Sequence, residues 1–367
     1  MPRRTATMLT STLVLIVLIA AALLIKVPYA EMSPGPTVNT LGKHGGEPVL
    51  SFPGRDDKRI NSTTGNLNMT TVSVTPADYR MHLVEAVAGW LAHDDVVVPY
   101  ETLYPDDRSA SEVDKQNAEE FSQSQESAKV AALRQVGEKV RARVVVSSVV
   151  KDSPSQGKLH AGDVIRAVDG QRVNQPQDVR RLVTKHRPGQ QVRFTVVPVS
   201  KAKAAEKAGK EPPRGDESRV TVRTAPAPDD RKRAMVGIES GVDHTFPFPI
   251  KIKLADVGGP SAGLMFALGI VDKLQKTDLT GGAFVAGTGT IDDEGKVGAI
   301  GGIRMKTIAA RKAGARYFLT PEDNCATAAK GKPGGLTLVK VDTIEDALDA
   351  LKGIRDKDSS AIPKCGG

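Results

Sequence analysis

The chain has 367 residues, with 51 lysines and arginines, 43 acidic residues and a formal net charge of +8. Its length predicts two or three domains, because a single core rarely grows beyond about 250–300 residues. Aromatic residues make up only 4% of the chain and the basic excess falls in solvated stretches such as 201–214, which argues against a nucleic-acid-binding surface.

An apolar segment occupies residues 8–25, which is long enough to span a bilayer. Two arginines precede it, so the positive-inside rule puts the N-terminus in the cytoplasm and everything after Lys26 on the other side of the membrane. A cleaved signal peptide is the alternative. Because Pro28-Tyr29-Ala30 is a poor small-x-small cleavage site, we expect residues 1–30 to form an uncleaved signal anchor.

Residues 31–137 predict a mixed β and helical segment that packs near the C-terminal domain of residues 226–355. Residues 70–74 alternate as a short strand does, and residues 77–92 read as a helix that contains the single tryptophan, Trp90. Residues 109–137 predict a longer helix that packs against the domain of residues 226–355.

Residues 138–225 contain the pattern S-P-x4-L-x2-G-D-x-I-x2-V-x-G, which runs from Ser153 to Gly170. It predicts a strand over 164–168, a tight hairpin at Asp169-Gly170, a helix over 177–186 and a strand over 191–196. A charged insertion, 200–218, predicts a mobile loop over 201–214. The pattern resembles the core of PDZ domains, which implies peptide binding by strand addition. A small β-rich spacer is the alternative.

Ser261 lies in the sequence Gly258-Gly259-Pro260-Ser261-Ala262-Gly263, between a predicted strand over 249–254 and a predicted buried helix over 262–271. This order puts the serine at the positive end of the helix dipole, which favours an oxyanion. Gly258 and Gly259 leave room for a substrate carbonyl. A serine that only caps the helix is the alternative.

The same motif fits the G-x-S-x-G nucleophile elbow of α/β-hydrolases, in which a histidine follows the serine along the chain. All six histidines of this chain precede Ser261. The order of residues therefore excludes an α/β-hydrolase triad.

Lys306 follows Gly301-Gly302 in an apolar setting and is the candidate base for Ser261. A lysine accepts a proton only when neutral, so burial must lower its pKa from about 10.4 to about 8. A solvated surface lysine is the alternative. Beyond Lys306, strands over 315–319 and 336–341 and a helix opened by the capping box at Thr343 predict a closed α+β domain.

The serine and lysine motifs together resemble the protease domain of Lon-type peptidases. The resemblance covers roughly residues 226–353 of a predicted domain that spans 226–355. The resemblance implies that Ser261 is the nucleophile and Lys306 the general base, and Thr288 matches a threonine that helps to hold the lysine. One departure is Gly258, which stands where many Lon proteases have an acidic residue. Asp256, two positions earlier, does not inherit that role automatically.

Anchor, mixed segment, PDZ-like domain and protease domain, followed by a tail over 356–367, give an α+β multidomain chain. This order resembles the YlbL-type, membrane-anchored, PDZ-containing Lon-like serine proteases. No G-x-x-x-x-G-K-[ST] motif occurs, so we expect no ATP-driven unfolding. The resemblance implies an ATP-independent serine endopeptidase with a Ser-Lys dyad. It would cleave flexible or unfolded protein segments outside the cytoplasmic membrane, and ring assembly in the family allows a homo-oligomer.

A different class of function stays open at this point, a membrane-tethered adaptor that binds peptides through its PDZ groove and has no activity. No cofactor is expected. The two cysteines, Cys325 and Cys365, are too few for a zinc site, but they allow a disulfide in an oxidising compartment.

Overall fold

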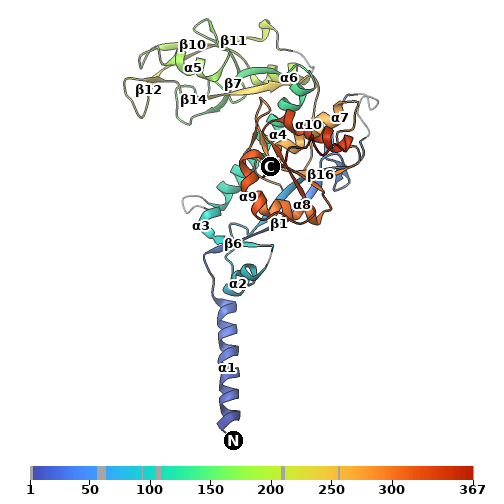
Figure 1. Cartoon of the computed structure of the whole chain (residues 1–367). Coiled ribbons are helices and arrows are strands. Elements are labelled where there is room, and N and C mark those ends of the chain that lie inside the picture. The colour runs from blue at the N-terminus through green and yellow to red at the C-terminus, as the bar shows by residue number, and fades with distance from the viewer. Residues whose placement is uncertain are drawn as a thin grey trace. The chain divides into compact units, whose positions relative to one another are not determined.

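The computed structural model describes residues 3–55, 63–92, 94–104, 109–207, 211–254 and 257–366. The chain divides into two compact units (Figure 1). Unit 1 consists of Met1–Val136 and Ile250–Gly367, and unit 2 is Gly137–Pro249. Both units mix helices and strands, as the sequence predicts.

The N-terminal segment forms α1 (Arg3–Leu24), a helix whose apolar window runs from Thr7 to Leu24. None of that window is buried within the structure. Its length and composition suit either a membrane span or a signal sequence. The sidedness expected from the flanking charges stays a prediction.

Unit 1 is built on a six-stranded mixed sheet with the order β20-β19-β16-β5-β1-β6. Its strands are β1 (Tyr29–Asn39), β5 (Asn66–Val74), β6 (Val96–Pro99), β16 (Phe284–Gly287), β19 (Tyr317–Pro321) and β20 (Thr337–Val341). β16 runs parallel to both β5 and β19, whereas β1 is antiparallel to β5 and β6. The region 31–137 therefore contributes strands to the same sheet as the region after residue 280.

Helices of unit 1 pack on this sheet and on each other. They are α2 (Leu83–Leu91), α3 (Tyr100–Leu103), α4 (Ala110–Gln135), α7 (Gly263–Leu274), α8 (Ile303–Lys312), α9 (Cys325–Lys330) and α10 (Ile344–Asp356), with the 3-10 turn η3 (Glu322–Asn324). The capping box predicted at Thr343 is confirmed, since its side chain accepts the N–H of Asp346 and opens α10. α4 packs on α7, with the rings of Phe121 and Phe266 5.9 Å apart.

Short two-stranded ladders complete unit 1. β2 (Lys43–His44) pairs with β3 (Glu47–Pro48), β4 (Leu50–Ser51) with β15 (Lys251–Ile252), and β17 (Thr290–Ile291) with β18 (Val297–Gly298). The strand predicted over 249–254 is thus only the two residues of β15, because its partner β4 is equally short.

The helix predicted over 77–92 begins only at Leu83. Residues 77–78 form a turn instead, closed by the N–H of Tyr79 on the carbonyl oxygen of Pro76. The chain then pairs with the segment after α1, because Met81 accepts the N–H of Val27 at 2.9 Å and Leu83 donates to Ile25 at 2.8 Å. These backbone groups are hydrogen-bonded to the segment after α1 and cannot also bond within a helix. The first part of the predicted helix therefore does not form.

Unit 2 contains a sheet with the order β11-β10-β8-β7-β14, to which β9 adds beside β8. The strands are β7 (Arg141–Val149), β8 (Val164–Val168), β9 (Gln171–Arg172), β10 (Gln191–Val197), β11 (Ser218–Arg223) and β14 (Ile238–Thr245), with the small ladder β12 (Ala225–Pro226) and β13 (Ala234–Met235). Asp169 and Gly170 both have positive φ, as the predicted tight hairpin requires. α5 (Pro176–Val183) covers the core around Phe194.

The mobile loop predicted over 201–214 is wrong for its first half, which forms helix α6 (Val199–Lys207). The side chain of Asp163 accepts the N–H of Val199 at 2.9 Å at the start of this helix, and Ala202 is buried against Val145 and Val164. A 3-10 turn, η2 (Arg214–Asp216), follows. Residues 208–210 of the predicted loop lie outside the described residues.

Candidate active site

The turn before Ser261 is held by α4. The N–H of Gly259 donates to the carbonyl oxygen of Asn117 at 2.9 Å, and the hydroxyl of Ser124 donates to the carbonyl oxygen of Pro260 at 2.8 Å. Gly259 has a φ of +78°, a conformation that favours glycine. The helix predicted to pack against the catalytic domain therefore fixes the backbone on which Ser261 stands.

Ser261 does not cap the helix that follows it. The N-cap of α7 is Ala262, whose side chain makes no capping hydrogen bond. Within the part of the chain that the structure describes, the N–H groups of Ser261 and Ala262 have no hydrogen-bond acceptor. These free donors at the positive end of α7 suit an incoming oxyanion.

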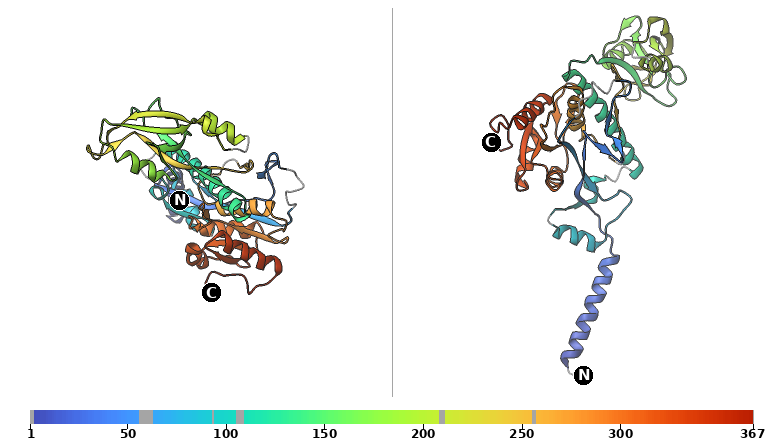
Figure 2. Two further views of the ribbon diagram at one scale, coloured as in Figure 1. Left: turned by 90° about the horizontal axis from the view of Figure 1, so that it is seen from above. Right: turned by 90° about the vertical axis from the view of Figure 1, so that its right-hand side faces the viewer.

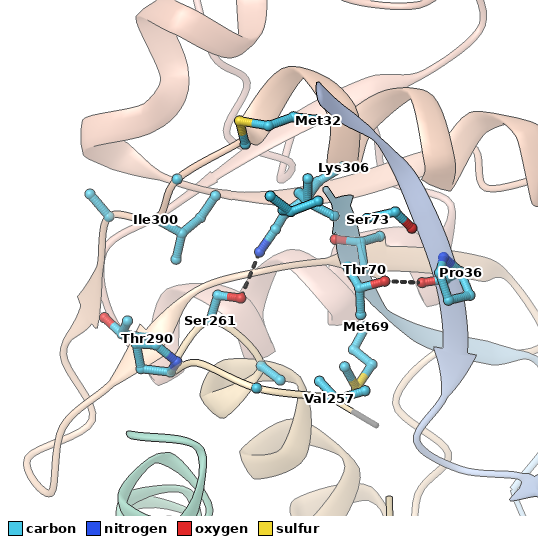
Figure 3. A pocket seen from close by; sticks show the side chains of 18 residues that line it. Met32, Pro36, Met69, Thr70, Ser73, Val257, Ser261, Thr290, Ile300 and Lys306 are labelled. Atoms are coloured by element: carbon cyan, nitrogen blue, oxygen red, sulfur yellow. Dashed lines mark hydrogen bonds between the residues drawn. The ribbon is translucent and has the colours of Figure 1, made fainter. Parts of the chain in front are cut away.

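Lys306 lies in the first turn of α8 and is directed at Ser261 (Figure 3). Its Nζ is 2.6 Å from Ser261 Oγ, and the residue is only 3% exposed. Gly302, the N-cap of α8, has a φ of +67°. A Cβ at Gly302 would lie 2.7 Å from Val72 Cγ2 of β5, so glycine lets the first turn of α8 rest directly on the sheet.

Thr288 joins the two residues. Its hydroxyl donates to the carbonyl oxygen of Ser261 at 2.9 Å and accepts from Lys306 Nζ at 3.0 Å. The next residue, Gly289, donates its N–H to the same carbonyl at 2.9 Å. The end of β16 therefore positions both the serine backbone and the lysine side chain.

Burial lowers the pKa of Lys306 from 10.5 to about 8, and desolvation is the cause. With a pKa of about 8, roughly a fifth of the lysine is neutral at pH 7.4, against about 0.1% for a lysine in water. The site therefore provides a base without a neighbouring carboxylate.

Gly258 is close to α4. A Cβ at this position would lie 3.0 Å from Asn117 Cβ, so a larger residue here would require α4 to shift. Asp256 lies outside the described residues, and the question of its role stays open to experiment. Among the residues that the structure describes, no group of three or more His, Cys, Asp and Glu side chains is arranged to hold a metal.

Ser261 and Lys306 line a cleft of about 670 Å³. Figure 3 shows Met32, Thr70, Ser73 and Ile300 around the serine. β1 and β5 contribute Met32, Pro36 and residues 69–74, β17 contributes Thr290, and the loops contribute Val257, Gly258, Pro260, Ala262 and residues 299–301. Sequence reasoning did not find this strand surface, because alternating residues in β5 carry no motif.

The sheet leaves one edge of β5 open beside this cleft. β5 pairs with β16 only as far as Met69, but it pairs with β1 as far as Val74. From Thr70 to Val74, no described strand pairs with the other edge. An extended chain could therefore be accommodated along it.

Comparison with known families agrees with this geometry. Residues 255–352, which include Ser261, Thr288 and Lys306, match the Lon protease (S16) C-terminal proteolytic domain, and residues 121–206 match the PDZ domain. This is a chain with a PDZ domain and a Lon-type proteolytic domain. Lon protease 2 of Bacillus subtilis is 34% identical over 95 residues, 26% of this chain and 17% of that protein. Lon protease of Campylobacter jejuni is 38% identical over 99 residues, 25% of this chain and 12% of that protein.

The similarity to Lon proteases is thus confined to the proteolytic domain, and the chain spans less than a fifth of the length of these curated relatives. Among solved structures, the PDZ domain of an SdrC-like protein from Listeria innocua is 22% identical. The match covers 28% of this chain and 98% of the Listeria domain, with a TM-score of 0.21.

Proposed function

We propose that this chain is a serine endopeptidase in which Ser261 is the nucleophile and Lys306 the general base. The observation that carries the proposal is the 2.6 Å contact between Lys306 Nζ and Ser261 Oγ, made by a buried lysine whose pKa is lowered to about 8. A base near neutral pH next to a hydroxyl is what nucleophilic catalysis by serine requires.

The contacts give each group a role. The Thr288 hydroxyl donates its proton to the Ser261 carbonyl oxygen, so its oxygen accepts a hydrogen bond from Lys306 Nζ. One N–H of the lysine is engaged in this bond. The lone pair of neutral Nζ is then free to accept the Ser261 proton as Oγ attacks the substrate carbonyl carbon. The free N–H groups of Ser261 and Ala262 bind the resulting oxyanion.

The same lysine completes the reaction. Protonated Lys306 gives its proton to the leaving amine as the C–N bond breaks, and an acyl-enzyme ester remains on Ser261. A water molecule then gives a proton to Lys306 and attacks the ester carbonyl. The acid product leaves when Oγ regains the proton from the lysine.

Backbone geometry supports an extended peptide as the substrate. The N–H of Thr75 donates to the carbonyl oxygen of Glu31, so these two residues form a hydrogen-bonded pair. Hydrogen-bonded and non-hydrogen-bonded pairs alternate along antiparallel strands, which makes Met32–Val74 and Pro34–Val72 non-hydrogen-bonded pairs. Val72 and Val74 then direct their N–H and C=O groups away from β1, towards the open edge. Pro34, which has no N–H to donate, lies opposite Val72 and agrees with this phase.

The proposed location is the outer side of the cytoplasmic membrane, with α1 as a single anchor and the N-terminus in the cytoplasm. A disulfide between Cys325 and Cys365 suits such an oxidising compartment. Since the chain contains no P-loop motif, we expect cleavage of flexible or unfolded segments without ATP. The PDZ unit would bind extended peptides by strand addition, and a homo-oligomer is compatible with this arrangement.

The test is cleavage of a casein-like substrate by the full chain in detergent, without ATP. Ser261→Ala and Lys306→Gln should each abolish cleavage, whereas Lys312→Gln on the exposed side of α8 should retain it. Full activity of either site variant would overturn the dyad. Peptide binding by a protein that never cleaves and is never labelled at Ser261 would favour the adaptor.

A further inference from the structure

The outward side of α2 is an apolar stripe. Val84, Val87, Ala88 and Leu91 follow the spacing i, i+3, i+4, i+7 of one helix face, and all four are exposed. Val84 is 40%, Val87 41% and Leu91 82% exposed. A surface helix of a soluble domain carries polar residues on this face.

The opposite side of α2 is already used for packing. Ala86 and Gly89 are buried, and a Cβ at Gly89 would lie 2.7 Å from Val97 Cγ2 of β6. The close packing at Gly89 leaves little freedom for the helix to rotate. The apolar stripe therefore faces outward because of the fold, not because the helix is loosely held.

Trp90 lies next to the stripe and is 54% exposed, with its ring edge-to-face with Tyr29 at 5.3 Å between centroids. Tryptophan and tyrosine are the residues that favour the boundary between lipid and water. Tyr29 begins β1 shortly after the end of α1, and Trp90 lies on α2.

The backbone ties α2 to the end of α1. Leu83 donates to the carbonyl of Ile25, Val27 donates to that of Met81, and Lys26 pairs with His82. In the right-hand view of Figure 2, α2 lies beside the C-terminal end of α1 and runs across its direction. A helix in this position would lie in the plane of a membrane that α1 crosses.

We propose that α2 is an interfacial membrane helix, whose face of Val84, Val87, Ala88 and Leu91 inserts between the lipids on the side where α1 emerges. This inference rests on the proposed anchoring by α1. The outward stripe carries no charge, so insertion depends on the acyl-chain boundary and not on anionic headgroups.

The consequence concerns which substrates the cleft can reach. Met32 lines the cleft only eight residues after Leu24, the last residue of α1. Eight residues span at most about 29 Å. With α2 in the interface, unit 1 is held at the surface instead of tilting about a single helix, and the substrates are segments close to the bilayer.

Trp90 makes the test direct, because it is the only tryptophan in the chain. The full chain is reconstituted into phosphatidylcholine vesicles, and anchoring is checked by flotation after an alkaline wash. Lipids brominated near the headgroup end of the acyl chain should lower the emission at least about twofold relative to unbrominated lipid, since an interfacial helix lies about 5–10 Å deep. Bromine near the chain end should quench less.

Two variants serve as controls. Trp90→Phe with Lys352→Trp moves the probe to an exposed position on α10 and should remove the quenching. Val87→Asn with Leu91→Asn keeps Trp90 but makes the stripe polar, and should reduce the quenching while flotation and casein cleavage are retained.

The outcomes separate this inference from the proposed function. Trp90 emission that is quenched no more than that of the Lys352→Trp probe, in protein that floats, overturns the interfacial helix. Protein that does not float overturns both the anchor and this inference. Failure of the wild-type chain to cleave casein bears only on the Ser261 proposal, because cleavage is measured in detergent, separately from the quenching of Trp90 in vesicles.

Discussion

Thr288 Oγ1 lies 3.0 Å from Lys306 Nζ and accepts a hydrogen bond from it. The same hydroxyl donates to the carbonyl oxygen of Ser261, so it must present a lone pair, not a proton, to the lysine. This contact sets the direction in which the remaining lone pair of a neutral Lys306 can point.

Thr288→Val should therefore lower kcat roughly 10–100-fold, because a buried hydrogen bond worth about 1–3 kcal/mol is lost and the lysine is no longer oriented. Thr288→Ser keeps the hydroxyl and should retain most of the activity. The measurement is kcat and KM for a fluorogenic peptide, and equal activity of the valine and serine variants would show that Thr288 does not position the lysine.

The rate should depend on pH through Lys306. Its pKa is lowered to about 8, and the proposed mechanism requires the neutral form. We therefore expect kcat/KM to rise about tenfold per pH unit below pH 8 and to level off above it. A profile that falls with rising pH over this range would contradict a lysine base. Stability of the protein over the same range is the necessary control.

The burial of protonated Lys306 should also lower the free energy of unfolding at neutral pH. Its folded-state pKa lies below that of the unfolded chain, so the penalty is present in full below about pH 8 and disappears as the pH rises towards about 10.5. Lys306→Met should raise the free energy of unfolding at pH 7 by up to about 3 kcal/mol. The gain should shrink between pH 8 and 10.5 in denaturant titrations, whereas Lys312→Met on the same helix should show no such trend.

The sequence is sufficient to predict that the serine and the lysine lie together and that the lysine is buried. Ser261 and Lys306 lie in glycine-rich motifs, and glycine is needed at Gly302 because α8 starts directly on β5. The buried run after Ala262 and the capping box at Thr343 are also local signals, which is why α7 and α10 are found at nearly the predicted residues.

Long-range pairing explains what the sequence does not predict. β5 lies between β1 and β16, and the latter follows more than 200 residues later, so no local pattern shows that they share a sheet. The sequence predicts that α4 packs against the catalytic domain, but it does not show that Asn117 and Ser124 hold the serine turn, because these contacts join distant parts of the chain. α6 shows the opposite case, in which burial of Ala202 orders a charged segment.

If the substrate binds along the open edge of β5, the effect of blocking its backbone N–H groups should alternate from one substrate residue to the next. If Val72 and Val74 bond to an extended peptide, N-methylation of alternate substrate residues should each remove one hydrogen bond and lower kcat/KM about 3–10-fold. Methylation of the residues between them should have little effect. The experiment is an N-methyl scan of one short cleavable peptide, and uniform sensitivity along the peptide would argue against strand addition at this edge.

The disulfide between Cys325 and Cys365 ties the C-terminal tail to the sheet. The N–H of Cys365 donates to Leu338, and Lys340 donates to Pro363, so the tail lies along β20. The disulfide closes a loop with a sequence separation of 40. The double variant Cys325→Ser, Cys365→Ser should lose about 2–4 kcal/mol of unfolding free energy through the greater freedom of the unfolded chain. Reducing agent should destabilise the wild-type protein equally and leave the double variant unchanged, and a melting temperature insensitive to both would show that the bond does not form in solution.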